Sequence, residues 1–151
     1  MPKPKIIHIP IILSAIILSA LSHSKSPIYS SQQGIAIKGY DTVAYFTSKK
    51  ALKGSFLHRH RFNNVTWLFS NRDNLNLFKK NPWGYIPAYG GYCAYFMSFG
   101  GLAPADPSQW HIHRGRLYLA NSLSTKNKWL SQINSHIKRA DSHWSKLRQK
   151  P

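Results

Sequence analysis

Cys93 is the single cysteine of the chain, and it follows the pair Gly90–Gly91. We predict a short helix beginning near Cys93, where the helix dipole would stabilise a thiolate. Met97 comes one helical turn later, so both sulfurs would lie on one face. With a nearby imidazole they would suit a monovalent copper ion. The alternative is that both side chains fill the core, because free cysteine is among the most buried residue types.

Four of the eight histidines form two pairs, His58 with His60 and His111 with His113, and this spacing of two places both members on one face of a strand. His60 is in phase with Phe62, so we expect it to be partly buried and able to act as a ligand. The second pair, His111 and His113, is expected to face solvent. A structural histidine is the alternative for His60. The candidate ligands for copper or zinc are Cys93, Met97 and His60.

Aromatic residues and one carboxylate suggest a pocket for a small polar or cationic ligand. We expect the segment 90–93 to lie against the first hairpin and leave a hollow there. The alternative is that Asp41 caps a turn beside an aromatic core. The candidate ligand-binding residues are Tyr40, Asp41, Tyr45, His60, Trp67, Tyr89 and Cys93.

Enzyme motifs are scarce in this chain. All four acidic residues are isolated aspartates, which gives no obvious acid–base pair. The sequence has no Gly-x-Ser-x-Gly elbow, no phosphate-cradling loop and no His-Glu-x-x-His helix. A thiol-dependent enzyme that uses Cys93 is the remaining catalytic alternative. A non-catalytic binding protein is therefore the first hypothesis.

The chain is strongly basic, with 21 Lys and Arg against 4 acidic residues and a formal charge of +17. Such a surface attracts nucleic acid, anionic lipid and acidic polymers without specificity. The basic residues come as scattered pairs rather than long runs, so no specific nucleic-acid motif is indicated. A polyanion-binding surface module is a third hypothesis.

The N-terminus has the pattern of an export signal. Lys3 and Lys5 precede an apolar run over residues 6–21, and small residues follow it. We predict a signal peptide over 1–24, a polar linker over 25–33 and one domain over 34–151, in a periplasmic or secreted protein. An uncleaved membrane anchor is the alternative. A single cysteine excludes an intramolecular disulfide, so packing must stabilise the domain.

These candidate residues must be positioned by short elements. Ile35, Ile37, Val43 and Tyr45 alternate and predict short strands or extended segments. Residues 58–62 and 66–69 flank Asn63–Asn64 and predict a β-hairpin. A helix is expected over residues 71–80, with Ser70 capping it.

The second half is expected to contain a helix, a hairpin and a helical tail. A two-turn helix is expected over 92–99, and a second hairpin pairs 110–113 with 116–119 around Arg114–Gly115. A helical tail follows, with a break near Asn134–Ser135. Together the elements predict an α+β fold, in which a small antiparallel sheet or hairpins pack with short helices under a C-terminal helical cover.

Three segments carry a family resemblance: Gly-Tyr-Asp-Thr-Val-Ala-Tyr-Phe at 39–46, Pro-Ala-Tyr-Gly-Gly-Tyr-Cys-Ala at 87–94 and Ile-Lys-Arg-Ala-Asp-Ser-His-Trp at 137–144. With them the chain resembles YHS-domain proteins in their small exported bacterial form. The resemblance implies the α+β fold but no assigned activity. The wider family is described as metal-handling through a Phe-Cys-Ser-x-x-Cys-x-x-x-Phe pattern. Here Ser70 and Asn74 stand at the two thiolate positions, so that metal site is absent.

Overall fold

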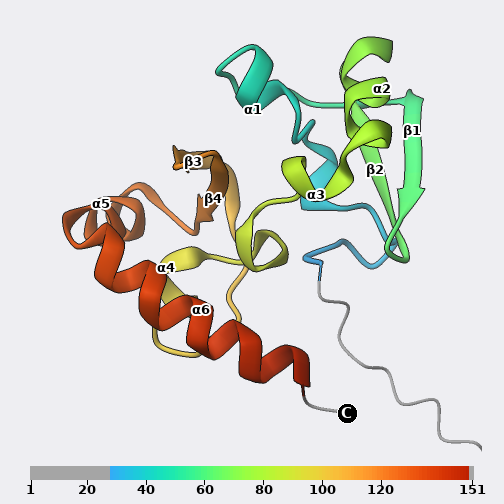
Figure 1. The fold of residues 1–151 in the computed structure, drawn as a ribbon. Coiled ribbons are helices and arrows are strands. Elements are labelled where there is room, and N and C mark those ends of the chain that lie inside the picture. The colour runs from blue at the N-terminus through green and yellow to red at the C-terminus, as the bar shows by residue number, and fades with distance from the viewer. Residues whose placement is uncertain (1–27, 150–151) are drawn as a thin grey trace, which may run out of the picture.

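The computed structural model describes residues 28–149 and confirms the predicted α+β class. Two separate two-stranded antiparallel sheets pack with short helices, and a long helix runs along one side (Figure 1). In chain order the elements are η1 (Ile37–Gly39), α1 (Ala44–Thr47), β1 (Ser55–Phe62), β2 (Val65–Phe69), α2 (Arg72–Lys80), α3 (Pro82–Tyr85), η2 (Ala88–Gly91), α4 (Ala94–Met97), β3 (Asp106–His113), β4 (Arg116–Ala120), α5 (Leu123–Ser131) and α6 (Ile133–Gln149).

Both predicted hairpins are confirmed. In the first, Phe62 pairs with Val65 around Asn63 and Asn64, whose φ angles are 51° and 63°. Asparagine tolerates this left-handed region better than most residues, and two such residues match the twist of the flanking strands. In the second hairpin His113 pairs with Arg116 across a two-residue turn that ends in a glycine. Local turn chemistry therefore determines the register of both hairpins.

The extended segments predicted before the first hairpin are confirmed only at Ile35, which forms an isolated β-bridge with Thr66, whereas Val43 and Tyr45 lie in a helical turn. Ile37 and Lys38 have φ angles of 49° and 53°, so the chain turns there instead of extending. Oδ1 of Asp41 then accepts hydrogen bonds from the backbone N–H groups of Val43 (2.9 Å) and Ala44 (3.2 Å). Because these groups lie at the start of α1, the carboxylate favours a helical turn over a strand.

Helix α2 agrees with the predicted range, but its cap is not Ser70. The side chain of Asn71 accepts a hydrogen bond from the backbone N–H of Asn74 at 2.8 Å. Asparagine is among the best N-cap residues, and this bond satisfies a backbone donor at the helix start. The hydroxyl of Ser70 is thereby left for another partner.

Helix α4 is shorter than the predicted two-turn helix. Cys93 stays outside the helix as its N-cap residue, since its N–H donates to the carbonyl of Ala103 at 3.0 Å and it forms a parallel bridge with Leu119. Gly100, with a φ angle of 82°, terminates the turn that follows. The segment over 90–93 is therefore bridged to the second hairpin, and the expectation that it lies against the first hairpin is wrong.

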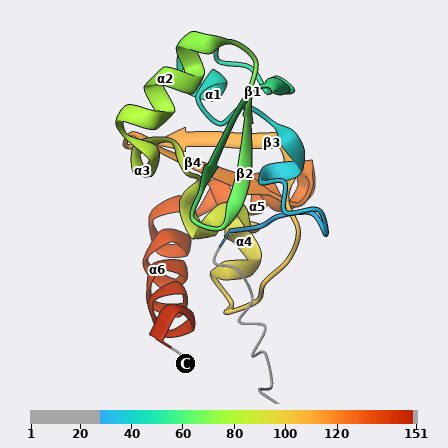
Figure 2. The ribbon, with the colours of Figure 1, turned by 90° about the vertical axis from the view of Figure 1, so that its right-hand side faces the viewer.

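The C-terminal helical cover is confirmed, with its break at Gln132 rather than at Asn134–Ser135. The φ angle of −139° at Gln132 separates α5 from α6. Helix α6 passes alongside α4 (Figure 2), and Ala140 on its inner face is fully buried. A small residue at this position allows the two helices to approach closely.

Two hydrophobic clusters form the core. The first joins the β1–β2 hairpin and α2 to the N-terminal turns and β4, and the second lies among η2, α4, β4, α5 and α6. Residues 28–33, expected to be a polar linker, begin with Ile28 at 3% exposure. The N–H of Tyr29 donates to the carbonyl of Gly90 at 2.8 Å, so this segment packs on the domain. The predicted signal peptide lies outside the described residues, and within 28–149 no helix could span a membrane.

Candidate functional site

Asp41 is fully buried, and protein donors occupy both of its carboxylate oxygens. Oδ1 accepts the Val43 and Ala44 amides described above. Oδ2 accepts hydrogen bonds from the backbone N–H of Ser70 (2.8 Å), its hydroxyl (2.7 Å) and the Asn74 side-chain amide (2.8 Å). Ser70 and Asn74, which stand where the YHS pattern has its two cysteines, therefore both donate to this carboxylate. Asp41 joins the N-terminal turn to α2 and has no free lone pair directed at a ligand.

The aromatic candidates near Asp41 are core residues. Tyr45 is fully buried and donates its hydroxyl hydrogen to the carbonyl of Pro107 at 2.8 Å, and burial raises its pKa. The indole N–H of Trp67 donates to the carbonyl of Phe62 at 3.1 Å. Tyr40 is half-buried beneath the ammonium group of a lysine. The polar groups of Tyr45 and Trp67 are used within the protein and a lysine covers the Tyr40 ring, so these rings support packing instead of a shared pocket.

His60 lies on β1 opposite Trp67, and its ring meets the edge of Phe78 at a centroid distance of 6.3 Å. Burial lowers the pKa of His60, and the positive charge of Lys79 lowers it further. This environment is that of a packed histidine. In the second pair, His111 contacts the ring of Trp129 instead of facing solvent freely.

The three candidate metal ligands are not brought together. Cys93 and Met97 are both fully buried, and Sγ of Cys93 accepts a hydrogen bond from the backbone N–H of Asn121 at 3.2 Å. Figure 1 places β1, which carries His60, and α4, which carries Met97, on opposite sides of the molecule. Across residues 28–149, no three His, Cys, Asp or Glu side chains are grouped so that they could hold a metal ion.

The buried position of Cys93 also bears on thiol chemistry. A nucleophilic sulfur must reach its substrate, and this side chain exposes no surface. His60, a base that could activate this thiol, lies on β1, whereas Cys93 is bridged to β4. No nucleophile and base are therefore paired at this cysteine.

A cavity of about 430 Å³ lies elsewhere, between α3, η2, the start of β4 and the end of α6. Of the sequence-predicted site residues, Tyr89 lines it. We call it the Tyr89 cavity. The lining residues that concern its chemistry are Trp83, Tyr89, Gly90, Arg116, Trp144 and Arg148. Aromatic and cationic groups from four separate elements thus converge on one space.

Tyr89 is held rigidly in the wall of the Tyr89 cavity. Its φ angle is 58°, in the left-handed region that a bulky residue rarely adopts. Its hydroxyl donates to Oδ1 of Asp141 at 3.0 Å, and its ring meets the edge of Trp144 at 6.2 Å. Burial raises the pKa of Tyr89, and the neighbouring carboxylate of Asp141 raises it further. The phenol therefore remains neutral and acts as a hydrogen-bond donor.

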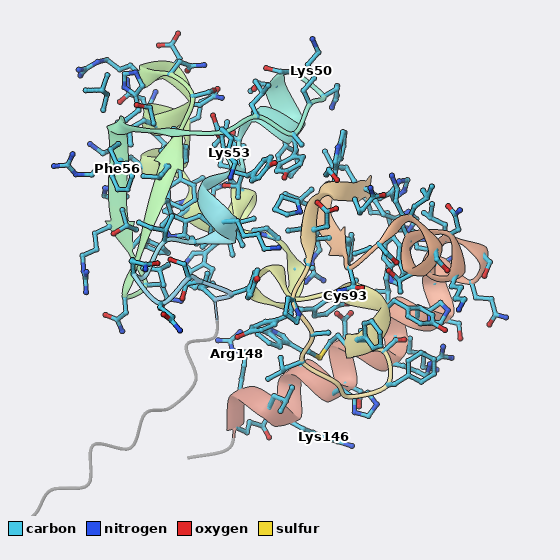
Figure 3. All side chains as sticks on the ribbon, turned by 180° about the vertical axis from the view of Figure 1, so that it is seen from behind. Lys50, Lys53, Phe56, Cys93, Lys146 and Arg148 are labelled. Atoms are coloured by element: carbon cyan, nitrogen blue, oxygen red, sulfur yellow. The ribbon has the colours of Figure 1, made fainter. Side chains whose placement is uncertain are left out.

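Two arginines line the same space. The guanidinium of Arg116 lies 5.8 Å from the centroid of the Tyr89 ring, and its Nη1 is 3.6 Å from Oδ1 of Asp141. Arg148 is exposed in the last turn of α6. In Figure 3 its side chain extends toward the body of the molecule, whereas Lys146 points away. Two cations and one carboxylate therefore surround the Tyr89 cavity.

Sequence reasoning missed most of this site. Trp144 fits the apolar stripe of the last helix, and Arg116 belongs to one of the scattered basic pairs. The one signal for this site is Trp83, which follows Asn81–Pro82 and is a large apolar side chain with 63% of its surface exposed. Even this signal needs the structure, because exposure cannot be read from the sequence.

The chain matches no family model, no curated protein and no solved structure. The resemblance to YHS-domain proteins therefore stays a prediction from the three motif segments. The function has to be inferred from the geometry of this chain.

Proposed function

We propose that the protein is an exported, non-catalytic binding protein of the YHS type that holds a small organic molecule in the Tyr89 cavity. The observation that carries this proposal is the cavity itself, whose volume of about 430 Å³ falls in the range of small-molecule sites. Its walls include three aromatic rings, and a few polar groups converge on it. This combination is typical of a ligand pocket.

Contacts within the protein hold the walls of the Tyr89 cavity in place. Tyr89 is fixed by its hydrogen bond to Asp141 and by the edge contact with Trp144. Trp83 on α3 is supported by an edge contact with Phe62 at 5.4 Å. Rings that are already positioned lose little conformational entropy when a ligand binds, which favours affinity.

A binding role fits the cavity better than catalysis. The acid that borders it, Asp141, is engaged by Tyr89 and Arg116, and Asp41 is saturated inside the fold. The only cysteine is buried away from solvent. No group among the cavity residues named above is placed as a nucleophile with an adjacent base, so we propose no chemical step.

Binding can be tested with the fluorescent dye 8-anilinonaphthalene-1-sulfonate, titrated into the protein. We expect one saturable site. Trp83→Ala removes an exposed wall of the cavity and should weaken binding by about tenfold, because one aromatic contact is lost. Phe56→Ala is the matched control, since Phe56 is 58% exposed and does not line the cavity. Absence of saturable binding, or equal effects of both variants, would reject the proposal.

Export is proposed from the N-terminal pattern alone. Lys3, Lys5 and the apolar run over 6–21 predict cleavage by a signal peptidase. Intact mass of the protein recovered outside the cytoplasm of a bacterial host should show loss of the first 24 residues or a few more. A product of full mass that stays with the membrane fraction would favour the anchor instead.

A further inference from the structure

We infer that the ligand of the Tyr89 cavity is a small organic acid with a flat apolar body, whose anionic group lies at Arg116 and Arg148. This inference rests on the proposed function and specifies its ligand class. The apolar body would lie beside Trp83 and Trp144. The sequence had suggested a polar or cationic ligand near Asp41, and the charges around the cavity favour the opposite sign.

The lining of the Tyr89 cavity is positively charged. Among its lining residues the charged side chains are Arg116 and Arg148, and none is a carboxylate. The nearest carboxylate, Asp141, accepts the Tyr89 hydroxyl and lies 3.6 Å from Nη1 of Arg116. That separation is longer than a charge-assisted hydrogen bond, so the guanidinium keeps donors for another acceptor.

Arg148 is the less constrained of the two cations. Within residues 28–149 it makes no hydrogen bond and no ion pair. Its guanidinium can therefore meet an incoming carboxylate, sulfonate or phosphate without breaking an existing contact. Such groups match the planar donor geometry of arginine.

A neighbouring groove extends the positive region. It shares Arg116 with the cavity and is also lined by Arg114 and Lys138, with Asp141 as its one acidic residue. The cationic side chains outnumber the single carboxylate, so the groove carries a net positive charge. A concave surface of one sign attracts ligands of the other, so the approach to the cavity favours an anion.

The aromatic walls suggest the shape of the ligand. Trp83 is 63% exposed, which leaves most of a large apolar ring in water. Trp144 is half-buried and reaches the same cavity from α6. A flat apolar body would cover both indole surfaces and remove them from water, a gain roughly proportional to the area buried.

The test compares two dyes with one skeleton. N-phenyl-1-naphthylamine is 8-anilinonaphthalene-1-sulfonate without the sulfonate, so the ratio of their dissociation constants isolates the contribution of the negative charge. We expect the sulfonate dye to bind at least about tenfold more tightly, because it can form charge-assisted hydrogen bonds. In the double variant Arg116→Gln/Arg148→Gln the ratio should fall to about one.

The control variant removes two positive charges at positions outside the cavity. Arg61→Gln/Arg72→Gln lowers the net charge equally but leaves the cavity lining intact, so the ratio should persist. Far-ultraviolet circular dichroism of each variant verifies the fold. Two dyes that bind with equal affinity, or a preference that survives in Arg116→Gln/Arg148→Gln, would overturn the anionic ligand while leaving the binding function standing. Equal loss in both double variants would attribute the preference to overall charge and also overturn it. If neither dye binds, the proposed function itself fails.

Discussion

The aspartates of this basic chain have structural partners. Asp41 accepts five hydrogen bonds inside the fold, and Asp106 accepts the backbone and hydroxyl hydrogens of Ser108. Asp141 joins Tyr89 to Arg116, and Asp73 lies in the first turn of α2, where a negative charge is favourable. The few acids are therefore used for structure.

Asp41→Ala tests the strongest of these interactions. The substitution leaves the Ser70 and Asn74 donors without their acceptor, so we expect a loss of about 3 kcal/mol or more in the free energy of unfolding. Urea denaturation measures it. Asp73→Ala is the control, since that carboxylate is exposed and should cost about 0.5 kcal/mol. A cost for Asp41→Ala as small as that of the control would contradict the role of this carboxylate.

The role of Asp41 shows what the sequence could reveal at this scale. The sequence identified Asp41, Ser70 and Asn74 as notable positions, and a capping aspartate was one of the readings left open. It did not reveal that the three side chains meet. Asp41 lies 29 residues before Ser70 and 33 before Asn74, and its contact with them depends on how the N-terminal turn packs against α2.

His136 should make the protein sensitive to acid. Its Nδ1 lies 2.9 Å from Oγ of Ser98 and 2.8 Å from Nη2 of Arg139. Burial lowers the pKa of His136, and Arg139 lowers it further. The unfolded chain therefore binds the proton first, so this contribution is complete above pH of about 6.5 and is lost as the pH falls toward the lower folded-state pKa.

Thermal unfolding over that pH window measures the effect. His136→Gln should flatten the fall in stability, and Arg139→Gln should flatten it less, because burial, the larger cause, remains. His60 and His111, whose pKa values are also lowered, leave a residual slope. If His136→Gln leaves the slope unchanged, His136 is not the group that titrates.

Cys93 should be inert toward thiol reagents in the folded protein. Its side chain is fully buried and Sγ is engaged by Asn121, so labelling requires local opening. We expect Ellman's reagent to react at least about 100-fold more slowly with the native protein than with the guanidinium-unfolded chain. Comparable labelling rates in the two states would show that the Cys93 thiol is accessible and would favour the thiol-dependent alternative.

At the scale of elements, the sequence correctly predicted the turns whose conformation is determined by the residues within them. Asn63–Asn64 and Arg114–Gly115 turn where their residue types favour a turn. Ile37 does not follow its own preference. A β-branched residue at a φ angle of 49° is costly, and it is tolerated because the side chain is fully buried in the first core. Tertiary packing overrides the strand propensity there, so the sequence pattern alone misleads.

The packing of α6 can be tested at Ala140 on its inner face. Ala140→Leu adds volume at a fully buried position, so we expect a loss of about 2 kcal/mol in the free energy of unfolding. Ser142→Leu, at an exposed position of the same helix, should stay within about 0.5 kcal/mol of the parent. Urea denaturation of both variants measures the difference, and equal values would mean that α6 is not docked as described.

At the scale of the whole molecule, the Tyr89 cavity is assembled from distant segments. Trp83, Tyr89, Arg116 and Trp144 come from four different elements and meet only when both hairpins and the last helix are in place. The α+β class was predictable because it follows from local patterns. The cavity was not, since its position depends on long-range packing that no single motif encodes.

The net charge belongs to the same scale. A formal charge of +17 attracts anions of every kind, and this effect weakens with salt. A ligand held in the Tyr89 cavity differs from this background because aromatic contacts, which salt does not screen, contribute to its affinity. Overall charge therefore increases the rate of encounter, and the cavity provides selectivity.

The central claim is that the Tyr89 cavity binds a flat organic anion. A crystal structure of the full chain with 8-anilinonaphthalene-1-sulfonate tests it most directly. We predict density for one dye molecule with its rings beside Trp83 and Trp144 and its sulfonate at Arg116 and Arg148. A dye bound only at other basic residues, with those four side chains making no contact to it, would contradict the account.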